Sequence, residues 1–221
     1  YSNPTTFGKT SVGTLTPAEA IAQVILTDQD METDPDGAVT DAAYELGAAI
    51  AAKIDTDLTA IFSSFATDKG AGTGATNTIA DLASAVAVVR NRMKRAGAVN
   101  AVLHPYQWQV LAKAASVAGS ATNAAPSLLE EVNAQFFVRQ FGGLSIFVSS
   151  NLSIDASDDA VIGVFSRDAL GLDMRRAPRI EPERDASRRG WELNLSAVYG
   201  SGVWRPKFGI KGTFDATAPT S

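Results

Sequence analysis

The chain has 221 residues with a formal net charge of -5, one histidine and no cysteine, and 45% of its residues are hydrophobic. At about 100–200 residues per domain, this composition predicts one or two globular domains with an ample core. It excludes disulfides, thiolate metal sites and clusters of histidine ligands, and no apolar run reaches the roughly 18 residues of a membrane span.

The charged side chains are unevenly distributed along the chain. Residues 1–89 carry 12 acidic and 3 basic side chains, whereas residues 90–221 carry 12 acidic and 16 basic ones. A division of this kind indicates either that the two halves fold against each other or that they meet different partners.

The first half is dominated by one long amphipathic segment. A polar stretch over residues 1–16 is typical of an extended arm or loop, and the apolar residues 17–26 fit either a helix or a strand. Apolar residues then recur at spacings of three and four, which predicts a spine helix over about residues 39–66. At about 1.5 Å per residue this helix is about 42 Å long, so we expect a flat or elongated molecule. Its stripe consists of Val39, Ala43, Leu46, Ile50, Ile54, Leu58, Ile61 and Phe65.

Two shorter helices and a strand are predicted in the middle of the chain. After a glycine-rich loop, Thr78 and Asp81 form a capping-box pattern at the start of a helix that ends before Gly97. Residues 98–103 read as a buried strand, and Pro105 fits the first turn of the next helix.

From about residue 136 the hydrophobic period changes to two, which predicts strands. Gly142 and Gly143 fit a hairpin turn, and residues 160–165 form a further strand. Two long strands surround a polar turn at residues 186–190, and alternation continues to Phe214. The elements together predict a mixed α+β protein without repeats.

No motif in the chain is complete enough to predict a catalytic centre. The loop Gly70–Gly74 lacks the Lys-Ser/Thr of a phosphate loop, and the acidic run with Asp34 and Asp36 lacks the Glu that closes a calcium loop. The G-x-S-x-G motif that would supply a serine nucleophile for His104 does not occur in the chain. The carboxylates of Asp158 and Asp159 are expected in an exposed loop without the geometry for acid–base catalysis. We therefore expect no cofactor, no metal site and no enzymatic activity.

Basic residues gather in two places. Arg90, Arg92, Lys94 and Arg95 end the second helix, where cations complement the helix dipole, and phosphate binding is the alternative. In the C-terminal strands, arginines alternate with acidic residues, which predicts cross-strand ion pairs. These arginines are Arg175, Arg176, Arg179, Arg184, Arg188 and Arg189.

Five segments in a fixed order carry a family resemblance. They are ELGAAIAAKIDTDL (45–58), VLHPYQWQVLAKA (102–114), FGGLSIFVSSNL (141–152), AVIGVFSRDALGLDMRRAPRIEPERD (160–185) and VYGSGVWRPKFGIKGTF (198–214). In this order they resemble the spine helix, the strand–HP–aromatic–helix segment, the glycine-led strand, the long charged strands and the closing strand pair of Hong Kong 97-type major capsid proteins of tailed bacteriophages. The resemblance covers roughly residues 17–214.

The resemblance implies an α+β Hong Kong 97-type capsid fold with a long spine helix, a peripheral domain, an axial domain and an extended N-terminal arm or loop. We expect the arm or loop remnant at residues 1–27 and the peripheral domain at 28–96, with its long strands at 176–204. The axial domain is expected at 97–175, with its last strand and the tail at 205–221. Tyr1 is not an initiator methionine, so we expect that the natural front was cleaved or lies outside this sequence.

The resemblance also implies a structural role in assembly. We expect self-assembly into hexamers and pentamers of an icosahedral shell, located in the virion and assembled in the host bacterial cytoplasm. Expected partners are the portal, scaffold or protease and decoration proteins, and packaged double-stranded DNA bound without sequence specificity, but no membrane. From the charge division, we expect the acidic front to lie against basic strands of adjacent subunits. The candidate interface residues are Lys9, Asp34, Asp36, Gly119, Ser120, Asn123, Arg179, Arg184, Arg188 and Arg189.

Two alternatives remain open on the sequence. An encapsulin-type nanocompartment shell shares the fold and differs in its cargo. A small-molecule-binding or enzymatic α+β domain, such as a periplasmic binding module, is disfavoured because no catalytic constellation and no signal-peptide pattern occur.

Overall fold

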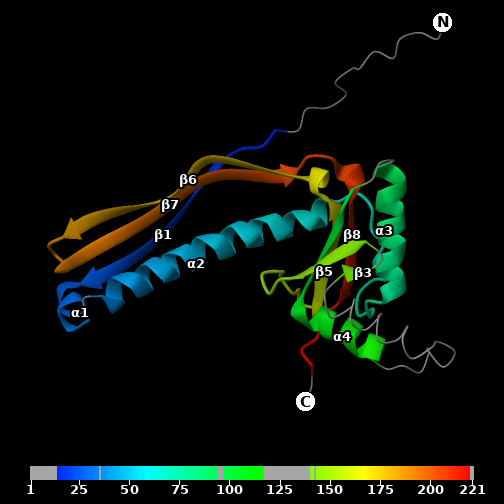
Figure 1. Ribbon diagram of the computed structural model, residues 1–221, viewed down its shortest axis with the longest axis horizontal. Helices are drawn as coiled ribbons and strands as arrows, with labels where there is room; N and C mark the ends of the chain where they lie inside the picture. Colours follow the sequence, from blue (N-terminus) through cyan, green and yellow to red (C-terminus); the bar gives the residue numbers. More distant parts are fainter. Residues whose placement is uncertain (1–13, 35, 94–96, 117–139, 142, 220–221) are drawn as a thin grey trace, which may run out of the picture.

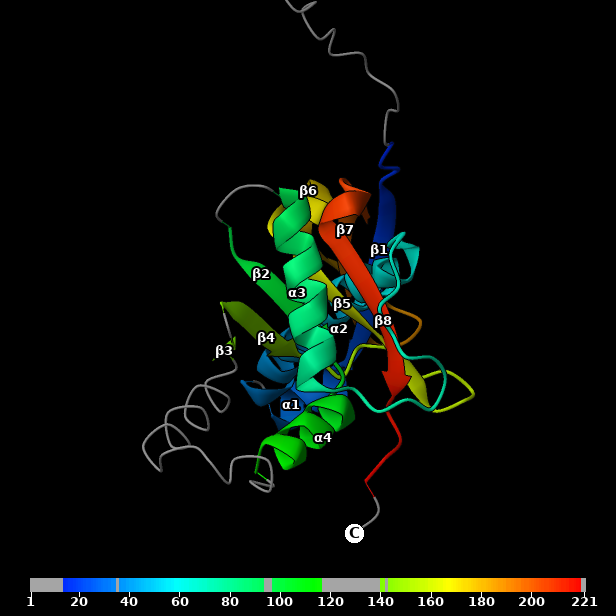
Figure 2. The same cartoon turned by 90° about the vertical axis from the view of Figure 1, so that its right-hand side faces the viewer.

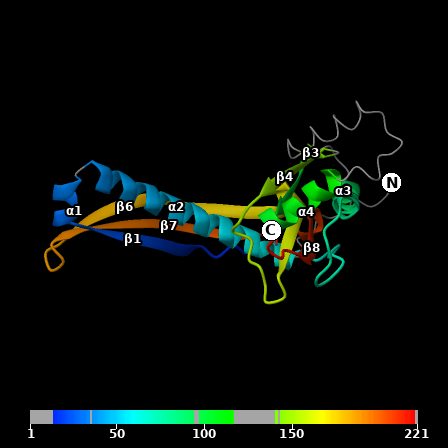
Figure 3. The same ribbon diagram turned by 90° about the horizontal axis from the view of Figure 1, so that it is seen from below.

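A computed structural model of the chain describes residues 14–34, 36–93, 97–116, 140–141 and 143–219. The described part consists of a long arm, built from a long helix, a short helix and three strands, and a lobe built around a second sheet (Figure 1). Strands β6 and β7 run from the lobe into the arm, and the spine helix runs beside them (Figures 1 and 3). The expectation of an elongated molecule is confirmed.

The sheet of the arm contains three antiparallel strands in the order β1-β7-β6. They are β1 (Ala18–Thr27), β6 (Leu170–Asp185) and β7 (Gly190–Val203). The two long strands around a polar turn are therefore confirmed. Residues 18–27, which the predicted domain division assigns to the arm or loop remnant, form a regular strand paired over its whole length with β7. The domain division itself stays a prediction.

The spine is the helix α2 (Gly37–Ala60), which is followed by the 3-10 turn η1 (Ile61–Ser64). The short helix α1 (Asp28–Thr33) precedes it at the far end of the arm. Leu46 and Ile50 are buried against Leu195 and Ala197 of β7, which confirms the centre of the predicted stripe. At the start of the helix the prediction is wrong, because Ala42 is buried whereas Val39 is 43% exposed.

The lobe contains a five-stranded sheet in the order β3-β4-β2-β5-β8. Only the β2–β4 pair is parallel among its described pairings. Two helices pack beside this sheet (Figure 2). The strands are β2 (Val99–Leu103), β3 (Gln140–Phe141), β4 (Leu144–Val148), β5 (Asp159–Ser166) and β8 (Gly209–Asp215), and the helices are α3 (Ile79–Met93) and α4 (Pro105–Ser116).

The local signals that the sequence predicted for the lobe are present. Thr78 and Asp81 form the capping box of α3, with the Asp81 amide donating to Thr78 Oγ1 at 3.2 Å and the Thr78 amide donating to Asp81 at 3.1 Å. The β3–β4 hairpin surrounds Gly143, whose φ of 77° suits glycine. Two further 3-10 turns, η3 (Arg167–Ala169) and η4 (Pro206–Phe208), lie where β6 and β7 meet the lobe.

A cluster of aromatic rings joins the spine to the lobe. Phe62 and Phe65 of the η1 region pack with Phe165 at ring-centroid distances of 5.3 and 6.2 Å. A Cβ on Gly163 of β5 would lie only 2.7 Å from the Phe62 ring, so this strand needs a glycine there. Phe62 and Phe65, at the end of the spine, thus pack against the sheet of the lobe.

Candidate assembly interface

Five of the ten candidate interface residues lie together at the far end of the arm, which we call the tip. Asp34 and Asp36 lie between α1 and α2, and Arg184, Arg188 and Arg189 lie at the β6–β7 turn. Arg179 lies farther back along β6. The other four candidates, Lys9, Gly119, Ser120 and Asn123, fall outside the described residues.

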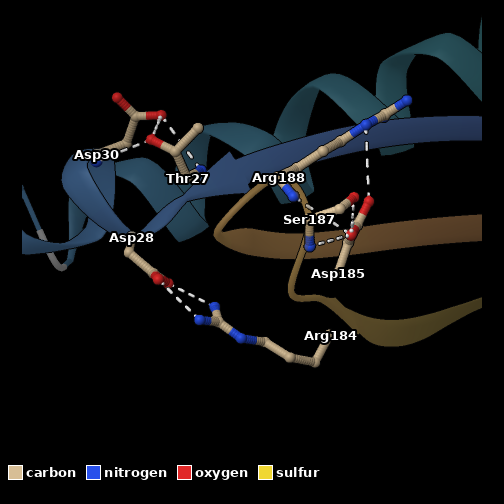
Figure 4. A network of polar contacts seen from close by, with 7 residues as sticks. All are labelled: Thr27, Asp28, Asp30, Arg184, Asp185, Ser187 and Arg188. Carbon is tan, nitrogen blue, oxygen red and sulfur yellow. Dashed lines mark hydrogen bonds and ion pairs between the residues drawn. The ribbon is translucent and has the colours of Figure 1, made fainter.

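The tip is built by a second capping box, at the start of α1. Thr27 Oγ1 accepts from the Asp30 amide at 3.2 Å, and an Asp30 carboxylate oxygen accepts from the Thr27 amide at 3.3 Å. The Asp28 amide donates to the Arg189 carbonyl at 2.8 Å, which fixes α1 against the β6–β7 turn. Figure 4 shows Thr27, Asp28 and Asp30 at the start of α1, beside the β6–β7 turn. The T-x-x-D spacing at Thr27 is the signal from which this cap is predictable.

Arg184 forms a bidentate ion pair with Asp28 across this junction (Figure 4). Its second contact measures 2.7 Å, and its guanidinium also lies 5.7 Å from the centre of the Trp191 ring. The hydrogen bond from Arg184 is the main cause that lowers the pKa of Asp28 below its ordinary value. The pair is surface-exposed, so it orients the tip more than it stabilises the fold.

The turn itself is held by Asp185. Its carboxylate accepts from the Ser187 amide at 2.8 Å and from Ser187 Oγ at 2.6 Å, and the hydroxyl bond is the main cause that lowers the Asp185 pKa. Arg188 lies within 3.6 Å of Asp185 and 3.4 Å of Glu192. Arg189 has a φ of 51°, and no ion pair is found for it in the described part of the chain.

The expected cross-strand pairing is wrong for three of the four β6 arginines, because Arg184 pairs with Asp28 of α1 and two others pair along their own strand. Arg175 pairs with Asp173 at 2.7 Å and Arg179 with Glu181 at 2.6 Å, along one strand. Residues two apart on a strand lie on the same face, so a partner is available without crossing to β7. Arg176 reaches farther and pairs with Glu19 of β1.

Part of the charge division is therefore satisfied inside one subunit. Glu19 and Asp28 belong to the acidic first half, and both pair with arginines of β6 in the same chain. Asp34 accepts from the Gly37 amide at 3.0 Å, and Asp36 caps α2 without a side-chain hydrogen bond. Other charged side chains of the two halves are not used in these pairs. For them, the expected contact between the acidic front of one subunit and the basic strands of an adjacent subunit stays a prediction.

The described residues offer no group of three or more His, Asp or Glu side chains suited to a metal ion. No described helix is long and apolar enough to cross a membrane. His104 is buried, its Nδ1 accepts from the Tyr106 amide at 3.3 Å, and burial lowers its pKa. This geometry fits a structural histidine.

Two buried polar residues of the lobe depart from the sequence analysis, which expected Asp159 in an exposed loop and did not single out Gln107. Asp159 is 1% exposed, which corrects the expected exposed loop, and its carboxylate accepts from the Gly74 amide at 3.0 Å. Gln107 is fully buried in α4 and bonds to backbone groups of three segments. Its spacing of four from Leu111 places it on the buried helix face, which is the signal that would have found it.

Comparison with known proteins identifies the kind of protein to which this arm and lobe belong. The sequence matches the family described as phage capsid protein over residues 15–212, which is most of the chain. The chain belongs to the phage capsid protein family. It is a structural shell protein of the Hong Kong 97-like type rather than an enzyme, and it is a component of a virion capsid.

Solved structures share the fold of this capsid protein at low sequence identity. Mycobacterium phage Che8 aligns with a TM-score of 0.67 and 18% identity, covering 88% of this chain and 70% of that chain. The capsid of cyanophage P-SCSP1u aligns with a TM-score of 0.65 and 18% identity, covering 90% of this chain and 72% of that chain. A virus-like particle from Pyrococcus furiosus aligns with a TM-score of 0.59 and 10% identity, covering 88% of this chain and 75% of that chain. No curated protein matches the sequence.

Proposed function

We propose that this capsid protein assembles into hexamers and pentamers that close an icosahedral head shell around a double-stranded DNA genome. The observation that carries the proposal is the family match over residues 15–212, together with the arm-and-lobe subunit. Assembly takes place in the cytoplasm of a bacterial host, and portal, scaffold or protease and decoration proteins are its further partners.

In this proposal the two parts of the subunit have separate roles. The arm, with α2 and the three-stranded sheet, forms the peripheral domain and contacts neighbouring capsomers. The lobe forms the axial domain and points to the capsomer centre, and the small, polar residues 119–126, which lie outside the described part of the chain, line the five- and six-fold axes. Many repeated contacts of modest size then close the shell.

Electron microscopy and light scattering of the purified protein test the proposal. We expect closed shells of uniform diameter, or capsomers that convert to shells when salt and concentration are varied. A stable monomer of 23.1 kDa under every condition would contradict the proposal. A shell map that places residues 119–126 at the capsomer periphery would reject the assignment of the lobe to the axes.

The nanocompartment alternative is tested by the contents of particles isolated from infected cells or an expression host with the phage genes. A phage head contains nuclease-protected double-stranded DNA of defined length. Shells that enclose a protein cargo and exclude DNA would favour the encapsulin-type alternative. Because the two shells share a fold, this measurement separates them where the subunit structure does not.

A further inference from the structure

Two groups of unpaired charge lie toward opposite ends of the spine helix. The basic cluster is defined as Lys69, Arg92, Arg205, Lys207 and Lys211, and it lies on the lobe. The acidic segment is defined as Glu32, Asp34, Asp36, Asp41 and Glu45, and it lies at and just behind the tip. No member of either group takes part in an ion pair with another described residue.

The basic cluster is held on one surface by hydrogen bonds through Thr67. Arg92 donates to Thr67 Oγ1 at 2.9 Å and to the Lys207 carbonyl at 3.4 Å. The Lys211 amide donates to the Thr67 carbonyl, and the Lys69 amide donates to the Lys211 carbonyl, both at 2.9 Å. These bonds hold three segments together that are distant in sequence, at residues 67–69, 92 and 207–211.

The acidic neighbours of the basic cluster are engaged locally. Asp68 accepts from the Gly70 amide at 2.8 Å. Asp81 accepts from the amide and from the hydroxyl of Thr78 in the α3 capping box. Neither forms an ion pair with the cluster. Lys69 and Lys207 are exposed, and no hydrogen bond or ion pair joins their side chains to another described residue, so they are available to bind a partner.

The carboxylates of the acidic segment are also available to a partner. Glu32, Asp34, Asp36, Asp41 and Glu45 are all exposed. Asp41 and Glu45 are one helical turn apart on α2, and their side chains have no hydrogen-bonding partner in the described part. The arginines at the tip that form ion pairs do so with Asp28, Asp185 and Glu192, outside the acidic segment.

We infer that the basic cluster of one subunit binds the acidic segment of a second copy of this chain. Within one subunit, Glu45 lies 15 residues before the end of α2 at Ala60, which is about 22 Å along the helix and more than twice the screening length of about 8 Å at physiological salt. The two groups cannot neutralise each other inside the chain. A contact between unlike surfaces of identical subunits is heterologous and repeats from subunit to subunit, as a closed shell needs. The inference rests on the proposed function and names the surfaces that meet.

Nucleic acid is the other class of partner with the right charge for the basic cluster. Phosphate groups would account for these cations but would leave the acidic segment without a partner. A second copy accounts for both groups with a single contact. We therefore assign the cluster to the contact between subunits.

Charge reversal on each side, alone and combined, tests the assignment. The basic reversal is Lys69→Glu with Lys207→Glu, and the acidic reversal is Asp41→Lys with Glu45→Lys. We expect each double variant to lower the yield of assembled shells by about tenfold or more, because like charges then face each other at every copy of the contact. The fourfold variant restores opposite charges and is expected to recover most of the wild-type yield.

The control exchanges a pair outside both groups, by Asp173→Arg with Arg175→Asp on β6. These side chains are ion-paired with each other, so the exchange is expected to leave the shell yield unchanged. Thermal unfolding of each variant monitors the fold, and a melting temperature within about 3 °C of wild type shows that the subunit is intact. Sedimentation through a density gradient measures the assembled fraction.

The outcomes separate this inference from the proposed function. A wild-type chain that never assembles overturns the proposed function. A wild type that assembles, with double reversals that assemble equally well or a fourfold variant that stays dispersed, overturns the inference alone. If the basic reversal forms normal shells that hold less DNA, the cluster binds nucleic acid and the inference is wrong.

Discussion

Gln107 joins three backbone segments of the lobe through one buried amide. Its Nε2 donates to the carbonyls of Ala160 and Phe214, both at 3.0 Å, and its Oε1 accepts from the His104 amide at 3.1 Å. The bonds connect the start of α4 with β5 and β8. Buried polar groups are costly when unpaired, so this side chain fixes how α4 sits on the sheet.

Replacement Gln107→Leu is expected to lower the free energy of unfolding by about 3 kcal/mol, because it leaves one amide and two carbonyls buried without partners. Urea unfolding followed by circular dichroism measures the change. Gln109→Leu is the matched control, since Gln109 is exposed on the same helix, and its effect is expected within about 0.5 kcal/mol. Equal effects of the two changes would show that the Gln107 bonds do not stabilise the lobe.

Tyr199 and Asp57 form a partly buried contact between β7 and the spine. Tyr199 Oη donates to Asp57 at 2.6 Å, and Lys53 donates to the same residue. Burial, and then the bond to Asp57, raises the pKa of Tyr199 to about 12. Burial also opposes ionisation of Asp57, but the bonds from Lys53 and Tyr199 outweigh it, so the Asp57 pKa is lowered.

The raised pKa of Tyr199 predicts an alkaline loss of stability. The folded chain keeps the phenol protonated above pH 10, whereas the unfolded chain releases the proton near its ordinary pKa of 10.0. The stabilisation is therefore complete below pH 10 and is lost as the pH rises toward about 12, with a slope of up to about 1.4 kcal/mol per pH unit. We expect Tyr199→Phe to flatten this dependence in urea unfolding at pH 9, 10 and 11. Tyr44→Phe, at a 78% exposed position, is expected to keep the wild-type slope, and equal slopes for all three proteins would contradict the assignment.

Among the elements, those with a strong hydrophobic period were predictable, and those that form only by pairing with another element were not. The alternation in residues 191–199 predicts β7, because one of its faces packs on α2. The ambiguous residues 17–26 become β1 only through pairing with β7, a contact about 170 residues away in sequence that no local pattern contains.

The spine helix shows where a helical period stops being informative. Its stripe predicts burial of Leu46 and Ile50 correctly, but the helical period does not show that the helix tightens to a 3-10 turn at Ile61. There Phe62 turns into the lobe and covers Gly163. The end of the spine is thus decided by the second sheet rather than by its own sequence.

At the scale of the whole molecule, the arm and the lobe are coupled through the aromatic cluster at the end of the spine. Phe62 is 2% exposed and contacts Phe65 and Phe165. Leu152 and Ala169 complete this cluster. The rest of the arm projects away from the lobe (Figures 1 and 3), so its stability depends on this junction.

We expect Phe62→Ala to cost about 3–5 kcal/mol and to separate the unfolding of the arm from that of the lobe. Trp191 on β7 reports on the arm and Trp108 on α4 reports on the lobe. With Trp204 replaced by Phe, chains that keep only one of these two tryptophans should show coincident urea transitions when Phe62 is present and separate transitions in the Phe62→Ala background. Coincident transitions in the Phe62→Ala chain would mean that other contacts couple the two parts.

The candidate interface was predictable only in part, because charge is visible in a sequence but pairing is not. The excess of acid before residue 90 and of base after it is a property of the chain itself. Folding brings Asp28 to Arg184 and Glu19 to Arg176, which removes these charges from any contact with a neighbour. It also gathers the basic cluster from segments that range from residue 69 to residue 211, a proximity that sequence order hides.

By itself the sequence determined the class of the protein: an α+β chain with a spine helix, long C-terminal strands and no catalytic equipment, arranged as in Hong Kong 97-type capsid proteins. These features follow from local periodicity, capping and composition, which act over a few residues. Only the tertiary structure decided the strand β1, the end of the spine, the burial of Gln107 and Asp159, and the charges that remain unpaired. Each depends on contacts between segments far apart in the chain, and these form only when the sheets assemble.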